Sequence, residues 1–262
     1  MNERNATFPS ALEAFFLVLC LWGLLYLIAL AMYDARHWLG MEDFYGLGTV
    51  AQVLANGILF TALLHWKNLS YRELFSASRS ASAATVCLVV PLVLLATPLY
   101  LLLVGQLEDL LQAAFPMNAG LQEQFRVMGE LRLPQIVAGC VIAPIVEEML
   151  FRGIVLRSFL HQYERRYAII GSAIVFGFAH GNLYQFVGAS CFGLVAGWLY
   201  ERTRSLIPGL ALHAAVNTSI TFWPDGGGTG TAAPGIATWL LVALPALPAC
   251  YALRRFLSAA AR

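Results

Sequence analysis

Eight apolar stretches, each close to the length that crosses a membrane, dominate this 262-residue chain. A helix needs roughly 20 apolar residues to cross the hydrocarbon core of a bilayer, and fewer where neighbouring segments cover its ends. The stretches lie near residues 11–32, 47–66, 82–105, 135–157, 167–180, 184–200, 206–223 and 236–256. We therefore expect an all-α membrane protein, with about eight transmembrane helices in one bundle and residues 1–262 forming a single polytopic domain.

The composition argues against the main alternatives to a membrane protein. Hydrophobic residues make up 59% of the chain and charged residues 12%, against roughly 45–50% and 25% in soluble domains. Sixteen Lys and Arg against fifteen Asp and Glu leave a net charge of +1, so a nucleic-acid partner is not expected. The cysteines are odd in number and widely spaced in apolar stretches, which argues against a disulfide framework: Cys20, Cys87, Cys140, Cys191 and Cys250.

The basic residues predict the orientation of the helices. If the N-terminus is cytosolic, twelve of the sixteen basic residues fall in the tails and loops on that side: Arg4, Lys67, Arg72, Arg79, Arg157, Arg165, Arg166, Arg202, Arg204, Arg254, Arg255 and Arg262. The opposite loops hold only Arg36, Arg126 and Arg132. Because cytoplasmic loops carry an excess of Lys and Arg, we expect both termini in the cytosol. The acidic loop 106–134 then lies outside.

Six polar or charged side chains interrupt the apolar stretches from the fourth to the seventh, where such residues indicate function. They are Glu147, Glu148, Arg152, His180, His213 and Asn217. Glu148 and Arg152 are four residues apart, with the acid first, which predicts a supporting ion pair on one helix face. Glu147 is rotated about 100° away and needs a partner from another helix. At ~1.5 Å per residue, Glu147, the two histidines and Asn217 fall in one layer about 10 Å thick, which predicts a shared site.

Two further features predict how the helices pack. Pro144 has no N–H to bond the carbonyl of Cys140, and a proline inside a helix tends to kink it, so we expect a kink that opens the bundle just before Glu147. Small residues at Ala189, Gly193 and Gly197 allow another helix to approach closely. We interpret this ladder as internal packing of the bundle.

These residue types can together hydrolyse an amide bond. A carboxylate and an imidazole that face one cavity can activate a water, with Glu147 as general base and His180 orienting the water. His213 and Asn217 can donate hydrogen bonds to the oxyanion of a tetrahedral intermediate. Alternatively, Glu147, His180 and His213 could hold a divalent metal such as zinc. The sequence has no H-E-x-x-H, G-x-S-x-G or G-x-G-D motif, which mark other proteolytic chemistries.

The order of the motifs resembles a known family. Residues 147–152 read E-E-x-x-x-R, residues 176–180 read F-x-x-x-H and residues 213–217 read H-x-x-x-N. On separate apolar stretches and in this order, they resemble the CAAX protease and bacteriocin-processing (CPBP, or Abi) family, which includes the type 2 CAAX prenyl endopeptidases. The resemblance covers roughly residues 135–220, which we expect to be the catalytic core.

The resemblance implies an eight-helix intramembrane endopeptidase. It implies Glu147 and His180 as the water-activating pair and His213 and Asn217 as the oxyanion site, while Glu148 and Arg152 match motif positions to which we assign a supporting role. The resemblance leaves open whether zinc takes part. We favour a metal-free glutamate mechanism with no cofactor, because zinc on Glu147, His180 and His213 would leave no obvious general base.

Two other functions remain open. A proton-coupled transporter could use the same acids and histidines as a relay. A non-catalytic membrane scaffold or self-immunity protein could share the fold. For the protease, the expected partners are the lipid bilayer and a membrane-tethered protein or peptide, with a CAAX-like tail, a leader or a sorting signal as the cleaved segment. The expected location is the bacterial inner membrane, or the endoplasmic reticulum membrane in a eukaryote.

Overall fold

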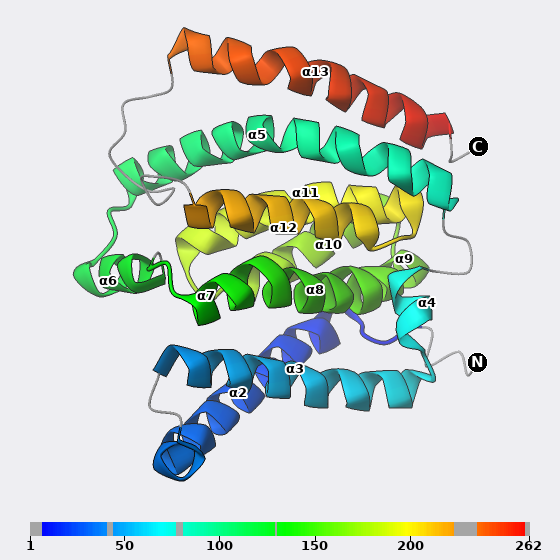
Figure 1. The fold of residues 1–262 in the computed structure, drawn as a ribbon. Coiled ribbons are helices and arrows are strands. Elements are labelled where there is room, and N and C mark those ends of the chain that lie inside the picture. The colour runs from blue at the N-terminus through cyan, green and yellow to red at the C-terminus, as the bar shows by residue number, and fades with distance from the viewer. Residues whose placement is uncertain (1–6, 41–43, 77–80, 129, 223–234, 260–262) are drawn as a thin grey trace.

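The computed structural model describes residues 7–40, 44–76, 81–128, 130–222 and 235–259, which are almost entirely helical (Figure 1). In chain order the first helices are α2 (Ala11–Leu39), α3 (Phe44–Lys67), α4 (Tyr71–Phe75), α5 (Ala83–Ala114) and α6 (Ala119–Met128). A continuous helical run follows: α7 (Leu133–Val137), η1 (Ala138–Ile142), α8 (Ala143–Glu148), η2 (Met149–Leu156) and α9 (Arg157–Gln162). The last are α10 (Arg165–Phe178), α11 (Leu183–Thr203), α12 (Ile207–Phe222) and α13 (Ile236–Ala259).

Each predicted apolar stretch is helical over the residues that the structure describes, apart from one or two residues at the ends of three stretches: 82, 179–180 and 206. Five of the described helices are long and apolar enough to cross a membrane: α2, α3, α5, α11 and α13. Helices α10 and α12 have 14 and 16 residues, which is shorter than a full crossing, and the run from α7 to α9 is divided by two π-helical segments. Over the described residues the prediction of an all-α protein is therefore confirmed, with five helices suited to crossing a membrane.

The helices stack in layers (Figure 1). Helix α13 packs on α5, and α5 packs in turn on α12 and α11. Helix α12 contacts α8 and η1, and α10 lies between α11 and η2. On the side of the bundle opposite α13, α3 packs against α7 and η1. Helix α2 crosses α3 and also contacts α10. The run from α7 to α9 therefore lies in the middle of the stack, with helices on several sides.

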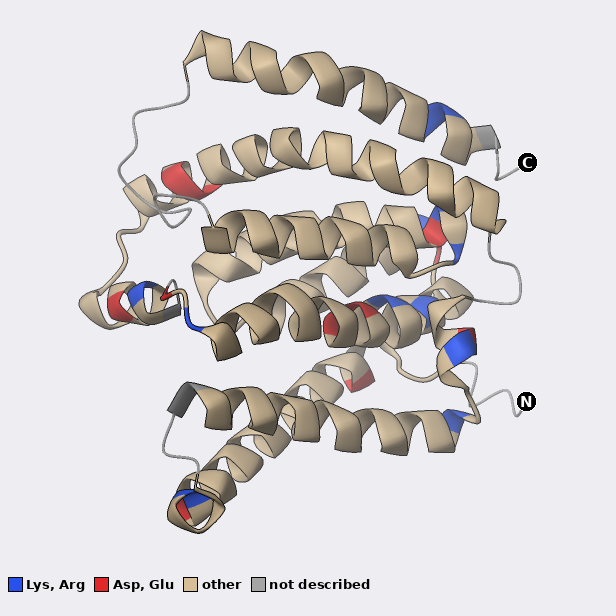
Figure 2. Ribbon diagram, in the orientation of Figure 1, with Lys and Arg blue, Asp and Glu red and all other residues tan. Residues whose placement is uncertain are grey.

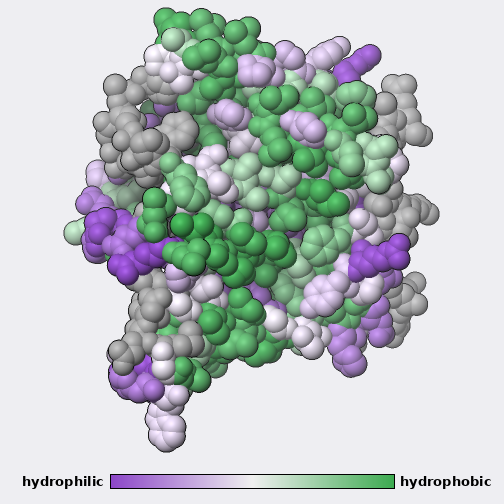
Figure 3. Space-filling view, in the orientation of Figure 1, coloured by the Kyte–Doolittle hydropathy of each residue, from purple (hydrophilic) through white to green (hydrophobic). Residues whose placement is uncertain are grey.

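Charge and hydropathy divide the surface. Most of the described Lys and Arg lie at the end of the bundle where α2 begins and α13 ends, while the opposite end carries α6 (Figure 2). Between these two ends the visible face is mostly hydrophobic (Figure 3). Arg4, Arg79 and Arg262, which contribute to the predicted orientation, lie outside the described residues.

The ladder of small residues packs inside the bundle, as predicted. A Cβ on Gly193 would lie 2.8 Å from Cα and Cβ of Ala173, so α11 approaches α10 to within backbone contact. A Cβ on Gly197 would lie 3.1 Å from the side chain of Ile169 on the same neighbour. Helix α11 can reach this distance only because these positions lack side chains.

Helix α5 is longer than the sequence suggested. It continues to Ala114, so Glu108 and Asp109 lie on its last turns and not in a loop. The acidic residues Glu123 and Glu130 lie on and just after α6, the short helix that follows. Two neighbouring acids are a usual sign of the end of an apolar helix, but here the helix continues past them because Leu110 and Leu111 restore its apolar pattern.

Candidate active site

A buried ion pair forms one side of the site. Arg152 Nη1 donates to Glu148 Oε1 at 2.9 Å, and both side chains are 1% exposed. The planar guanidinium also lies over the rings of Phe176 and Phe192, with its Cζ 4.4 and 5.1 Å from their centroids. The predicted contact between residues four apart is therefore present, and aromatic faces supply the rest of the environment of the cation.

Gly209 allows α12 to cover this pair. A Cβ at this position would lie 2.7 Å from Glu148 Oε2, so a larger residue would meet the buried carboxylate. Gly209 lies one helical turn before His213 on the same face of α12. The spacing brings the imidazole against the acids of α8.

His213 is the partner that Glu147 needed from another helix. The imidazole is buried between the two acids: Nδ1 lies 3.1 Å from Glu148 Oε1 and Nε2 lies 3.6 Å from Glu147 Oε2. Glu147 is the more accessible acid, with 26% of its side chain exposed, and its Oε2 has no hydrogen-bond partner. His213 therefore connects the accessible carboxyl to the buried ion pair.

Two π-helical segments flank the acids. The π-helical segment η1 ends just before Ala143, and Pro144 follows as the second residue of α8. A wide π turn absorbs the hydrogen bond that a proline cannot make, so the helix continues through Pro144 without a break. The Gly139 carbonyl of η1 accepts a hydrogen bond of 2.8 Å from Asn217 Nδ2. The predicted proline distortion thus takes the form of a π-helical turn that is tied to α12.

His180 lies in a tight turn just after α10. Its N–H donates to the Gly177 carbonyl at 3.1 Å, and the next residue, Gly181, has a φ of +71°, which few residues other than glycine adopt readily. Trp22 Nε1 on α2 donates to the Ala179 carbonyl at 3.1 Å. The imidazole Nδ1 lies 3.0 Å from the Phe176 carbonyl, which leaves Nε2 free for a second contact.

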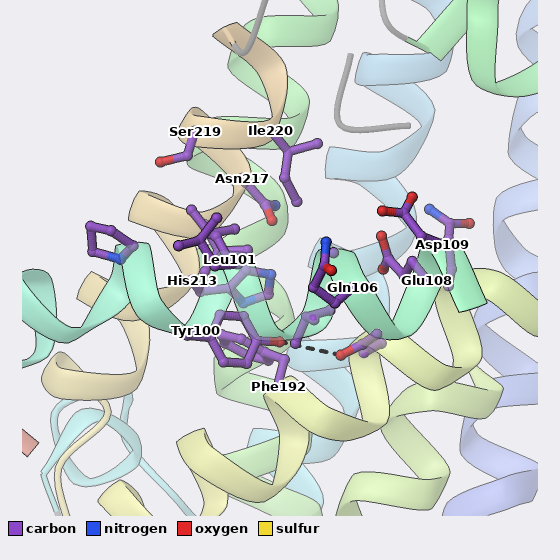
Figure 4. A pocket seen from close by; sticks show the side chains of 18 of the residues that line it. Tyr100, Leu101, Gln106, Glu108, Asp109, Phe192, His213, Asn217, Ser219 and Ile220 are labelled. Carbon is purple, nitrogen blue, oxygen red and sulfur yellow. Dashed lines mark hydrogen bonds between the residues drawn. The ribbon is translucent and has the colours of Figure 1, made fainter. Parts of the chain in front are cut away.

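One cavity is lined by residues of α5, α10, α11, α12 and α13, and by His180 just after α10. Its volume is about 400 Å³, and His180, His213 and Asn217 are among the residues that line it. Figure 4 shows His213 and Asn217 from α12 beside Tyr100 and Leu101 of α5. Glu147 does not line this cavity directly and reaches it through its contact with His213.

The structure thus assembles most of the predicted site. Glu147, Glu148, Arg152 and His213 are linked by direct contacts, and His213 shares a cavity with His180 and Asn217. The described side chains of Glu147 and His180 make no direct hydrogen bond to each other. A water molecule or a substrate atom would therefore have to lie between Glu147 and His180 to connect the two side chains.

Two aromatic residues at the centre of the site were not predicted from the sequence. Phe176 is the first residue of the F-x-x-x-H motif, and its ring contacts the imidazole of His180 edge-on, with centroids 5.0 Å apart. Phe192 packs on His213 with a centroid distance of 4.5 Å. With sixteen Phe in the chain, composition cannot identify these two, and only the spacing of Phe176 from His180 pointed to one of them.

The fit to a metal ion is incomplete. Glu147 Oε2 and His213 Nε2 are 3.6 Å apart, close to the separation of two ligands that share one zinc with bonds of about 2.0–2.2 Å. Within the described ranges, however, no group of three or more His, Cys, Asp or Glu side chains could hold a metal ion. The predicted zinc set of Glu147, His180 and His213 is therefore not assembled in that part of the chain.

The part of the chain that carries the three motifs matches a known protein family. Residues 129–219 match the family described as type II CAAX prenyl endopeptidase Rce1-like. The curated protein named "Putative membrane peptidase YdiL" from Bacillus subtilis (strain 168) is 26% identical over 85 residues, which cover 32% of this chain and 35% of that protein. The chain thus matches about a third of the length of this relative. No solved structure matches the chain significantly.

Proposed function

From this match of residues 129–219 to the type II CAAX prenyl endopeptidase Rce1-like family, which agrees with the CPBP resemblance of the motifs, we propose that the chain is an intramembrane endopeptidase. It would hydrolyse a peptide bond of a membrane-associated protein or peptide. The observation that carries the proposal is the contact between Glu147 and His213 at 3.6 Å beside a cavity that His180 and Asn217 also line.

In the proposed reaction Glu147 is the general base. Its buried Oε2 has no hydrogen-bond partner, so it can accept a proton from a water that His180 orients through Nε2. The hydroxide then attacks the carbonyl carbon of the scissile bond. The protonated Glu147 later gives its proton to the leaving nitrogen as the C–N bond breaks.

His213 and Asn217 stabilise the oxyanion in this proposal. The amide of Asn217 has two N–H donors, and one is used by the Gly139 carbonyl, which fixes the side chain and leaves the second for the substrate. Glu148 fixes the ring of His213 through Nδ1, so Nε2 is the nitrogen that would donate to the developing charge. Such preoriented donors commonly supply the largest share of the rate enhancement.

The oxyanion role of His213 requires a hydrogen on both ring nitrogens, because Nδ1 lies against the Glu148 carboxylate and Nε2 would donate to the oxyanion.

The mechanism is proposed without a metal. Each residue then has one task, and Glu148, which is committed to Arg152, is not needed as a base.

The proposed topology has eight crossings with both termini in the cytosol. The start of α2, the end of α13 and most of the described basic residues lie at one end of the bundle (Figure 2), which is what an even number of crossings would produce. The cavity lies in the other half, because it is lined by the C-terminal half of α5 and by the N-terminal turns of α11 and α13. In a bacterial inner membrane it would therefore lie nearer the face away from the cytosol.

The test uses purified protein in lipid nanodiscs and a pool of single-span peptides. The pool contains CAAX-like tails, leader-like segments and sorting-signal segments, and products are identified by mass spectrometry. We expect wild type to cleave members of the pool and Glu147→Gln to be about 10²–10⁴-fold slower. Glu164→Gln, the same change in a side chain that is 71% exposed, is the matched control and should cleave normally.

The alternatives give different results in the same system. Retention of a tenth of wild-type cleavage by Glu147→Gln would remove Glu147 as the base. Proton-driven uptake that depends on Glu147, without cleavage, would indicate the transporter. Peptide binding without any hydrolysis would indicate the non-catalytic member of the fold.

A further inference from the structure

The cavity has an acidic side that the proposed reaction does not use. Two histidines and two acids line it: His180 and His213 in the proposed active site, and Glu108 and Asp109 at the end of α5. No Lys or Arg is among the described residues that line it. Figure 4 shows the two carboxyls on the opposite side of the cavity from His213 and Asn217.

The position of Glu108 follows from the geometry of α5. Tyr100, Val104 and Glu108 are spaced by four residues and lie on the same face of the helix, and all three line the cavity. The carboxyl lies against the backbone of Gly188 on α11, where a Cβ would be only 2.5 Å from Glu108 Oε1. Tyr100 Oη donates to the carbonyl of the same glycine at 3.3 Å. Gly188 therefore provides the space that this carboxyl occupies.

Glu108 has no partner, unlike the acids nearby on α6. In the described part of the chain its carboxyl makes no hydrogen bond or ion pair. Glu123 on α6 instead receives two hydrogen bonds of 2.7 Å from Arg126, which lower its pKa. A half-buried carboxyl that lines a cavity without a counterion can bind a cation there more strongly than in water, because the local dielectric is low.

We propose that Glu108, with Asp109 beside it, makes the cavity selective for a peptide segment that carries a Lys or Arg side chain. The proposal rests on the proposed endopeptidase function and names its substrate class. A basic side chain near the scissile bond would pair with Glu108, while an acidic side chain would face like charge.

The same charges disfavour a free C-terminus close to the scissile bond. A CAAX-like tail places its terminal carboxylate three residues beyond that bond, at most roughly 10 Å away for an extended chain. Glu108 and Asp109 would repel this carboxylate, and no basic residue among the described lining residues would bind it. An internal bond in a basic segment next to an apolar span is therefore the preferred substrate.

The test compares three single-span peptides that differ at one position close to the scissile bond, which carries Lys, Gln or Glu. The full-length protein in nanodiscs is used throughout. Cleavage is followed by mass spectrometry, and binding is measured separately by fluorescence anisotropy on the Glu147→Gln protein. We expect the Lys peptide to be preferred over the Glu peptide by at least about tenfold, the scale of a hydrogen bond between charged groups.

Four variants connect this preference to the acidic side. Glu108→Gln should reduce the preference to within about twofold and Glu108→Lys should reverse it. Gly188→Ala should also reduce it, because the new Cβ displaces the flexible carboxyl from its position. Glu123→Gln, an equal loss of charge on α6, is the control and should keep the wild-type preference.

The outcomes separate this proposal from the function on which it rests. If no peptide is cleaved, the endopeptidase proposal fails, and the binding measurements still decide whether the cavity prefers Lys. If wild type cleaves and binds the Lys, Gln and Glu peptides equally well, the proposed selectivity is wrong. It is also wrong if Glu108→Gln elutes and unfolds like wild type but keeps the wild-type preference for the Lys peptide. Faster cleavage of a peptide with a free C-terminus than of its C-terminal amide would also overturn it.

Discussion

Replacing Glu148 with Gln would remove the charge that balances Arg152 inside the bundle. Both side chains are 1% exposed, and the carboxylate is 2.9 Å from Arg152 Nη1 and 3.1 Å from His213 Nδ1. Among the described residues no second acceptor already bonds the guanidinium, because its Nε and Nη2 make no hydrogen bond and the rings of Phe176 and Phe192 lie beside it. Removing one partner of a buried ion pair costs about 3–5 kcal/mol, so we expect a loss of stability in this range.

The free energy of unfolding can be measured by steric trapping in bicelles. Glu147→Gln is the matched control, since it makes the same change one residue away in a side chain that has no Arg partner, and it should lose less than about 1 kcal/mol. The double variant Glu148→Gln/Arg152→Met should recover most of the stability, because it removes both charges. Normal stability of Glu148→Gln together with loss of cleavage would refute this reasoning and assign Glu148 to the chemistry.

Other measurements test the proposed mechanism and the packing. Glu147→Gln, His180→Ala and their double variant should lose similar amounts of activity, because residues that act on one water are not additive; losses that multiply would separate the two residues. Protein dialysed against a strong chelator should keep its cleavage activity, and elemental analysis should find far less zinc than protein; activity restored only by zinc or cobalt would contradict this. Gly193→Ala should lose about 1–3 kcal/mol of stability through contact with the Ala173 backbone, whereas Gly23→Ala has nothing within 4 Å to meet; equal unfolding curves would contradict the close packing.

Features that depend on local spacing could be predicted from the sequence. Apolar runs indicated the helices, because burial in lipid requires long apolar segments whatever the tertiary contacts are. The four-residue spacing of Glu148 and Arg152 predicted their contact, since a helix places such residues on one face. The need of Glu147 for a partner on another helix also followed from spacing, although the sequence did not identify His213 as that partner.

Features that depend on contacts between helices could not be predicted. Pro144 signals a distortion of its helix, but the sequence does not show that the distortion takes the form of a π-helical turn tied to α12 by Asn217. The carboxyl of Glu108 was expected in an outer loop because acids usually end an apolar helix. Only the structure shows that Gly188, 80 residues later, provides the space that keeps it against the cavity.

The π-helical segments on either side of α8 control the direction in which the acids point. Each residue added to or removed from a helix rotates everything after it by about 100° about the helix axis. The wide turns of η1 precede Glu147 and Glu148, so the number of residues in that segment determines whether both carboxyls point toward α12. Deleting one residue between Ala138 and Ile142 would shorten the helix by a single step and leave every motif residue in the chain. Unless the wide turns of η1 tighten to α-helical ones and absorb the loss, both acids would turn away from His213, so the spacing upstream of the first motif also constrains the site.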